Sequence, residues 1–311
     1  MNELTFEEKN LLVIYNSAGT REGLIAALED MRGYLEPDEA ELRELTGSAL
    51  DKLRAMSDNS MPPSISPPIS IRRISPMTNK LQAALQLADD TARQVTGSYQ
   101  AWTAFLTTAA RLYKYPFPEQ LMIYAQRPEA TACAEWDFWN QRMRRYIRRG
   151  SKGIALIDTS QGRPVLRYVF DVSDTGRMDN GLNPNLWQYR PEHGEVVGAA
   201  LEGRFEVSGG NGLPAQLENI ASRLAEEYWD SYQTDILRIV DGSFLEGYDT
   251  FNTGAAFRSA AAVSITYTLL SRCGLDPDEH LRHEDFLSVF DFNTRDAIVE
   301  LGTAVSRSSE Q

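Results

Sequence analysis

Apolar residues recur at spacings of three and four along most of this chain, which is the pattern of amphipathic helices. Within residues 1–58 this spacing predicts three short helices. Thr5 and Glu8 form a capping-box pattern at the start of the first, and Leu28 and Leu50 lie on the apolar sides of the second and third. Residues 1–58 are therefore expected to form a small three-helix unit.

The same spacing predicts further helices on both sides of a stretch with β character. These helical segments are 80–95, 99–113, 121–124, 136–147, 217–237 and 255–270. In the segment 136–147, Trp136, Trp139 and Met143 are expected to face inward. Segments 154–157 and 165–172 predict two strands that pair as an antiparallel hairpin. The predicted fold class is α+β and mostly helical, with one small antiparallel β-sheet.

Composition suggests where the chain divides into domains. Residues 59–79 contain five Pro and five Ser, and Pro-Pro pairs resist both helix and sheet formation, so this stretch predicts an extended linker. We therefore predict an acidic helical domain at 1–58, the linker at 59–79, a central domain at 80–180 and an acidic helical extension at 181–311.

Charge is distributed unevenly along the chain. The formal net charge is −13, yet the stretch from Arg111 to Phe170 holds eleven Lys or Arg against five Asp or Glu. Residues 1–58 hold thirteen acids and six bases, and residues 171–311 hold twenty-four acids and ten bases. A basic island inside an acidic protein is the electrostatic pattern expected of a surface that binds nucleic-acid phosphates.

Cations and aromatic residues of this island are the candidate DNA-binding residues. They are Arg142, Arg144, Arg145, Arg148, Arg149, Lys152, Lys114, Tyr113, Tyr115 and Trp136. The six cations between positions 142 and 152 have no acid among them and exceed what a helix C-terminus needs to balance its dipole. They would contact phosphates, and the aromatic rings would stack on bases. The alternatives are a solvated basic face and a buried aromatic turn at 113–117.

Three blocks of this region resemble a known family. The runs PFPEQLMIYAQRPEATACAEWDFWN, RRGSKGIALI and YVFDVSDTG are similar to the N-terminal single-stranded-DNA-binding domain of the antirestriction protein ArdC. Variants of that domain also open large helicase and methylase proteins of conjugative elements. SFLEGYDTFN and SITYTLLSRCGLD resemble the continuation of those proteins, so the resemblance covers about residues 80–303. It implies single-stranded DNA as the partner.

The N-terminal segment resembles a second family. The run NLLVIYNSAGTREGLIAALEDMRGYLEPDEAELRELTGSALDKL is similar to the transposon-transfer assisting proteins, which are small helical proteins of conjugative transposons. This resemblance implies a mobile-element context. The alternative is a three-helix bundle that serves packing alone.

The residue patterns that mark common enzyme classes are missing. His193, His280 and His283 lack the His-Glu-x-x-His spacing of the peptidase-like domain in full ArdC-type proteins, and Cys133 and Cys273 are isolated. We therefore expect no enzymatic activity, no metal and no cofactor. The polar N-terminal residues and the absence of a long apolar run favour a cytoplasmic protein that does not enter a membrane.

The leading hypothesis is a non-enzymatic, cytoplasmic protein of a conjugative transposon. It would bind single-stranded DNA through the ArdC-like domain, and either assist transfer or protect incoming DNA. One alternative is a protein-interaction or DNA-mimic antirestriction module whose acidic flanks recruit a conjugation or restriction protein. Another is the truncated head of a larger DNA methylase or helicase polypeptide. The sequence indicates no particular oligomeric state.

Overall fold

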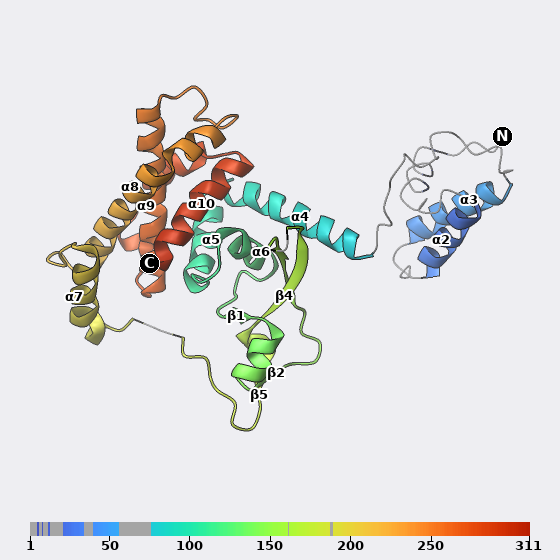
Figure 1. Cartoon of the computed structure of the whole chain (residues 1–311), viewed down its shortest axis with the longest axis horizontal. Coiled ribbons are helices and arrows are strands. Elements are labelled where there is room, and N and C mark those ends of the chain that lie inside the picture. Colours follow the sequence, from blue (N-terminus) through green and yellow to red (C-terminus); the bar gives the residue numbers. More distant parts are fainter. Residues whose placement is uncertain are drawn as a thin grey trace. The chain divides into compact units, whose positions relative to one another are not determined.

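The computed structural model describes residues 5, 8, 12, 21–33, 40–55, 76–160, 162–186 and 189–311. The chain divides into two compact units, Met1–Lys80 and Leu81–Gln311. Helices dominate both, and the second unit adds short antiparallel strands (Figure 1). The predicted class, α+β and mostly helical, is confirmed.

The first unit contains helices α2 (Arg21–Gly33) and α3 (Ala40–Ala55), which pack through a leucine core. Its buried leucines are Leu12, Leu24, Leu28, Leu50 and Leu53. The predicted capping box is present, because Thr5 N donates to Glu8 Oε2 at 2.7 Å and Glu8 N donates to Thr5 Oγ1 at 3.2 Å. The second and third predicted helices are confirmed. Most of the first predicted helix and linker residues 59–75 lie outside the described residues.

Long helices form most of the second unit. They are α4 (Pro76–Val95), α5 (Tyr99–Arg111), α6 (Phe117–Gln126), α7 (Gly194–Phe205), α8 (Leu213–Ile239), α9 (Thr250–Arg272) and α10 (Arg295–Glu310). Short 3-10 segments join them, among them η5 (Pro191–His193), η6 (Pro277–Glu279) and η7 (His283–Asp291). Helix α4 already begins at Pro76, which suits a proline in a first turn, so the predicted linker ends earlier than position 79. Its buried face runs through Ala84 and Ala92, while Leu85 is exposed.

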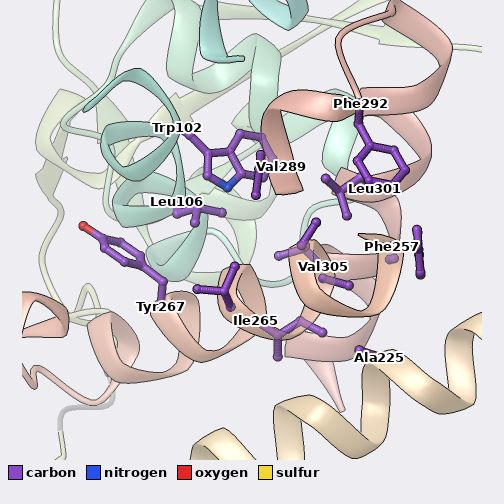
Figure 2. Packing of buried hydrophobic residues seen from close by; sticks show 14 of the residues in the cluster. Trp102, Leu106, Ala225, Phe257, Ile265, Tyr267, Val289, Phe292, Leu301 and Val305 are labelled. Atoms are coloured by element: carbon purple, nitrogen blue, oxygen red, sulfur yellow. The ribbon is translucent and has the colours of Figure 1, made fainter. Parts of the chain in front are cut away.

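One large core unites the helices on both sides of the central strands. Trp102 and Leu106 of α5 pack with Phe257 of α9, and Figure 2 shows Leu301 and Val305 of α10 in the same cluster. The Trp102 indole donates from Nε1 to Ser264 Oγ at 3.0 Å, so its polar group is satisfied inside the core. Because α5 and α6 share this core with α8, α9 and α10, the boundary predicted at residue 180 does not separate two cores.

The strands form two small antiparallel sheets. The first has the order β1 (Cys133–Ala134), β4 (Val165–Asp171), β3 (Ile154–Asp158), and the second pairs β2 (Arg145–Ile147) with β5 (Thr175–Arg177). Leu156 lies opposite Arg167, so the predicted hairpin is confirmed. Helix α6 contacts α10 and β3, and it connects the helical core to the sheet (Figure 1).

The helix predicted over 136–147 is present only over 136–142, and its continuation to 147 is wrong. A π-helical turn, η3 (Phe138–Arg142), is followed by Arg144, whose φ of 53° lies in the left-handed region. This conformation is costly for a residue other than glycine, and it turns the chain out of the helical path. Arg145 then starts β2 instead of continuing a helix.

Candidate nucleic-acid interface

The basic segment lies between two strands rather than on a helix. Strand β2 ends at Ile147 and β3 begins at Ile154, and residues 148–152, here called the basic turn, connect them. Arg148 N donates to Asp174 O at 2.8 Å, and Ser151 N donates to Arg148 O at 3.1 Å. Gly150 has a φ of 89°, which only glycine adopts readily, so the turn depends on it. The backbone of the basic turn is therefore fixed against Asp174, between β4 and β5.

Four of the predicted phosphate-binding arginines are exposed. Arg142 ends η3, Arg144 precedes β2, and Arg148 and Arg149 open the basic turn. Among the described residues, Arg142, Arg144 and Arg149 make no side-chain hydrogen bond, and Arg148 donates only from Nη1 to Ser173 O at 3.2 Å. Lys152, at the end of the turn, is also exposed. These five side chains carry charge close to the sheet surface.

Arg145 differs from its neighbours, and its assignment as a phosphate contact needs correction. It is 9% exposed. Its Nε donates to Thr175 Oγ1 at 2.7 Å, and Nη1 donates to Leu182 O at 3.2 Å and to Asn183 Oδ1 at 3.3 Å. With these acceptors occupying the guanidinium, Arg145 holds β2, β5 and the segment after β5 together. Its role is structural.

Two exposed tyrosines flank the basic turn, and neither was among the predicted site residues. Tyr146 is 48% exposed and lies opposite Gly176. A Cβ at Gly176 would meet Tyr146 Cζ at 2.3 Å, so the ring lies across the glycine. Tyr168 of β4 is 44% exposed, and Gly153 lies against it, because a Cβ there would be 3.2 Å from Tyr168 Cβ. The alternation of buried and exposed residues along β2 and the glycine opposite Tyr146 are the sequence signals that could have revealed the exposed Tyr146 ring.

Trp136, just before η3, and Phe138, the first residue of η3, add two more exposed rings. Trp136 is 50% exposed, which contradicts the expectation that it faces inward but suits its predicted role as a stacking residue. Phe138 is 47% exposed and was not predicted. Trp139 is buried as expected, and its Nε1 donates to Phe170 O at 2.8 Å. The buried indole anchors this segment while its neighbours stay in solvent.

The residues of the aromatic turn at 113–117 contact other parts of the protein and not the exposed rings and cations described above. Tyr115 Oη donates to Cys133 O at 2.8 Å, and burial raises the pKa of this phenol, so its ring is committed to the protein interior. Phe117 is buried in the main core. Tyr113 is half-buried beneath the Arg272 guanidinium, whose central carbon lies 3.5 Å from the ring centroid. Lys114 is exposed, with Nζ 5.7 Å from the same ring. The predicted buried aromatic turn is thus correct for Tyr115 and Phe117.

A buried carboxylate shapes the end of β4. Asp171 accepts hydrogen bonds from Thr131 N at 2.7 Å, Ala132 N at 3.0 Å and Ser173 N at 2.9 Å. Burial by itself would raise the pKa of Asp171, but these hydrogen bonds outweigh it and lower the pKa. The ionised carboxylate therefore fixes the backbone that supports the basic turn.

Ion pairs occupy some of the arginines in the described ranges and leave others, including several near the basic turn, without a salt bridge to a described residue. Ten form salt bridges with Asp or Glu: Arg54, Arg93, Arg127, Arg167, Arg190, Arg223, Arg238, Arg258, Arg282 and Arg295. Arg142, Arg144, Arg148 and Arg149 have no carboxylate partner among the described residues. In a chain with a net charge of −13, these unpaired cations remain available to an external anion.

Comparison with known proteins identifies the N-terminal part of the chain. Residues 4–61 match the family model described as "Putative transposon-transfer assisting protein". No curated protein and no solved structure matches the chain. The predicted resemblance of the N-terminal segment is confirmed over these residues, and the ArdC-like resemblance of the central region stays a prediction.

The described residues of the transposon-transfer-like segment, residues 4–61, include a buried charged cluster around Glu8. Glu8 is 1% exposed and lies within 2.7 Å of Lys52 Nζ and 2.6 Å of Ser48 Oγ. Burial alone would raise the pKa of Glu8, but the hydrogen bonds from Lys52, Ser48 and Thr5 lower it. This cluster joins the capping box to α3, and its role is structural.

Two further properties of the second unit bear on the sequence predictions. Of the described helices, none is both long enough and apolar enough to cross a lipid bilayer. Within the described ranges, no three His, Cys, Asp or Glu side chains gather where they could hold a metal ion. Cys133 is a free thiol whose pKa burial raises to about 12.

Proposed function

We propose that the chain is a mobile-element protein that binds single-stranded DNA on the surface around the basic turn. The observation that carries this proposal is the unpaired arginines beside exposed aromatic rings. Arg148 and Arg149 would contact phosphates, while Tyr146 and Tyr168 would stack on bases on either side of the turn. Affinity for unpaired strands needs both elements, since a cationic groove tracks the backbone and aromatic faces bind any base.

The single strand is favoured over the duplex by the shape of this surface. Arg148, Arg149 and Lys152 lie in a tight turn and Arg142 ends the short η3, so no long helix presents these cations to a major groove. Exposed rings such as Tyr146 gain stacking energy only from bases that are not already stacked in a duplex. The description of the family matching residues 4–61 names transposon transfer, which supports a role in the transfer of mobile DNA. The ArdC-like blocks support the same partner.

A titration of the full chain with labelled oligonucleotides tests the proposal. Single-stranded DNA should bind more tightly than duplex, measured by fluorescence anisotropy at several salt concentrations. Each phosphate contact contributes a slope of about −0.7 in log K against log salt, so five engaged cations give roughly −3.5. Arg145 adds nothing to this slope because its guanidinium is already occupied. No binding to the single strand at low salt would refute the proposal.

Matched variants locate the surface. Arg149→Met should weaken binding and reduce the salt slope by about 0.7. Arg238→Met removes the same charge from an exposed, salt-bridged residue of α8 and should leave binding unchanged. Gly176→Ala would force the Tyr146 ring from its position, since the new Cβ would overlap it. The loss of binding free energy for single-stranded DNA should then approach that of Tyr146→Ala, about 1 to 3 kcal/mol for one stacked base. If Arg149→Met and Arg238→Met behave alike, the surface lies elsewhere.

A further inference from the structure

A cavity of about 640 Å³ lies beside Tyr113, between the C-terminal ends of α5 and α9. Its volume is within the range of small-molecule sites. The polar residues that line it include Arg111, Thr131, Asn185 and Arg272, and Ala110, Leu186 and Leu275 add apolar surface. None of the described lining residues is Asp or Glu. The cavity thus combines two guanidinium groups, neutral hydrogen-bonding groups and an aromatic ring.

Neither arginine of the cavity has a carboxylate partner among the described residues. Arg272 stacks on the Tyr113 ring at 3.5 Å and donates from Nη1 to Ser309 O at 3.3 Å. Arg111 donates from Nε to Ala130 O at 2.8 Å and from Nη2 to Pro128 O at 2.7 Å. Each therefore keeps donors that these carbonyls do not use. Two such guanidinium groups on one cavity wall favour an anionic ligand.

The helix ends explain only part of this arrangement. Arg111 is the last residue of α5 and Arg272 the last residue of α9, where a cation is favoured by the helix dipole. A dipole interaction does not require the guanidinium to lie flat on Tyr113 inside a cavity. Stacking restricts the guanidinium to one plane, which pre-organises its remaining donors for a phosphate oxygen.

The cavity wall is also connected to the proposed DNA surface. Arg145 binds Leu182 O and Asn183 Oδ1, and Asn185, two residues further along the chain, lines the cavity. A strand that leaves the basic turn along this segment would arrive at the cavity. The cavity has room for a single nucleotide, and no described lining residue is acidic, although Asp171 and Glu129 lie near enough to act electrostatically on Arg111.

We propose that this cavity binds a nucleoside 5′-monophosphate group, with the phosphate at Arg111 and Arg272 and the base against the apolar wall. This inference deepens the proposed function and rests on it where the nucleotide is the 5′ end of a bound DNA strand. A free nucleotide would use the same contacts. The cavity would give the protein a preference for strands with a 5′-phosphate.

The test compares two oligonucleotides of one sequence, one with a 5′-phosphate and one with a 5′-hydroxyl, on the full chain. Because charged hydrogen bonds are lost with the phosphate, the 5′-phosphorylated strand should bind about tenfold more tightly or better. Arg272→Met should remove this difference, whereas Arg149→Met should weaken both strands and keep their ratio. Arg238→Met, on the exposed surface of α8, should keep both the parent's affinity and its preference. Equal affinity of the parent for both strands overturns the assignment to a strand end.

A second measurement distinguishes a free nucleotide from a strand end, and it tests the cavity independently of the proposed DNA binding. Calorimetric titration with dTMP and with inorganic phosphate needs no oligonucleotide. If no oligonucleotide binds, the proposed function fails, and dTMP binding that Arg272→Met abolishes would still establish the cavity as a nucleotide site. If oligonucleotides bind without a 5′-phosphate preference and dTMP does not bind, the cavity inference fails while the proposed function stands. Inorganic phosphate binding as tightly as dTMP would overturn the nucleotide assignment. Thermal melting of each variant checks that it is folded.

Discussion

Replacing Arg145 by Met tests the structural role given to this residue. The guanidinium donates to Thr175 Oγ1 at 2.7 Å, to Leu182 O at 3.2 Å and to Asn183 Oδ1 at 3.3 Å, and the side chain is almost fully buried. Hydrogen bonds from a charged donor contribute about 1.5 to 3 kcal/mol each, and the acceptors left behind lie close to buried backbone. Since water can reach part of the site, we expect a net loss of about 3 kcal/mol in the free energy of unfolding.

The assay is thermal unfolding followed by circular dichroism, with Arg149→Met as the matched control. In a unit of this size, 1 kcal/mol shifts Tm by about 2 to 4 °C, so Arg145→Met should lower Tm by roughly 6 to 12 °C. Arg149 is exposed and has no partner among the described residues, so its replacement should change stability by less than about 0.5 kcal/mol. The two variants should therefore separate, one losing stability and the other DNA affinity. Equal melting temperatures would refute the assignment of Arg145.

Three further predictions concern stability. Because the pKa of Asp171 is lowered in the folded protein, its contribution to the free energy of unfolding is present above the ordinary pKa and is lost as pH falls through the lowered value. In urea titrations run at several pH values, Asp171→Asn should therefore reduce the loss of stability at acid pH. An unchanged loss of stability at acid pH would contradict this prediction. Gly302→Ala should destabilise by about 1 to 3 kcal/mol in urea unfolding, since its Cβ would lie 2.1 Å from Cε2 of the buried Phe117, and a neutral result would show that the ring can move. Trp139→Ala should cost about 3 to 5 kcal/mol by the same assay, and a loss below 1 kcal/mol would exclude a core role.

The helical part of the fold could be predicted because its signal is local. In α5, Trp102, Phe105 and Ala109 repeat at helical spacing and are all buried. Trp136, Trp139 and Met143 show a similar spacing, but the left-handed conformation at Arg144 and the pairing of β2 with β5 override it. That pairing joins residues distant in sequence, which apolar spacing does not report.

The candidate site was predictable as a region but not as a set of side chains. The local excess of Lys and Arg located the basic turn, because charge can be counted without knowing where each side chain points. Arg145 and Arg149 look alike in the sequence, but Arg145 lies in β2 and is buried, whereas Arg149 lies in the basic turn and is exposed. The exposed Tyr146 depends on Gly176, a residue on the opposite strand, and the pairing of Arg272 with Tyr113 depends on how α9 packs on α5.

Helix α10 completes a core that α5 and α6 begin much earlier in the chain. Ser306 Oγ donates to Tyr115 O at 3.1 Å across 191 residues, and Phe117 packs against Gly302. During synthesis, the aromatic side chains of α5 and α6 would therefore emerge from the ribosome long before their cover. Contacts of such separation form slowly, and exposed apolar surface invites association with chaperones or other chains. The proposed DNA-binding region would thus mature only after translation has passed α10, and a fragment limited to residues 80–180 would lack the core residues that α8, α9 and α10 supply.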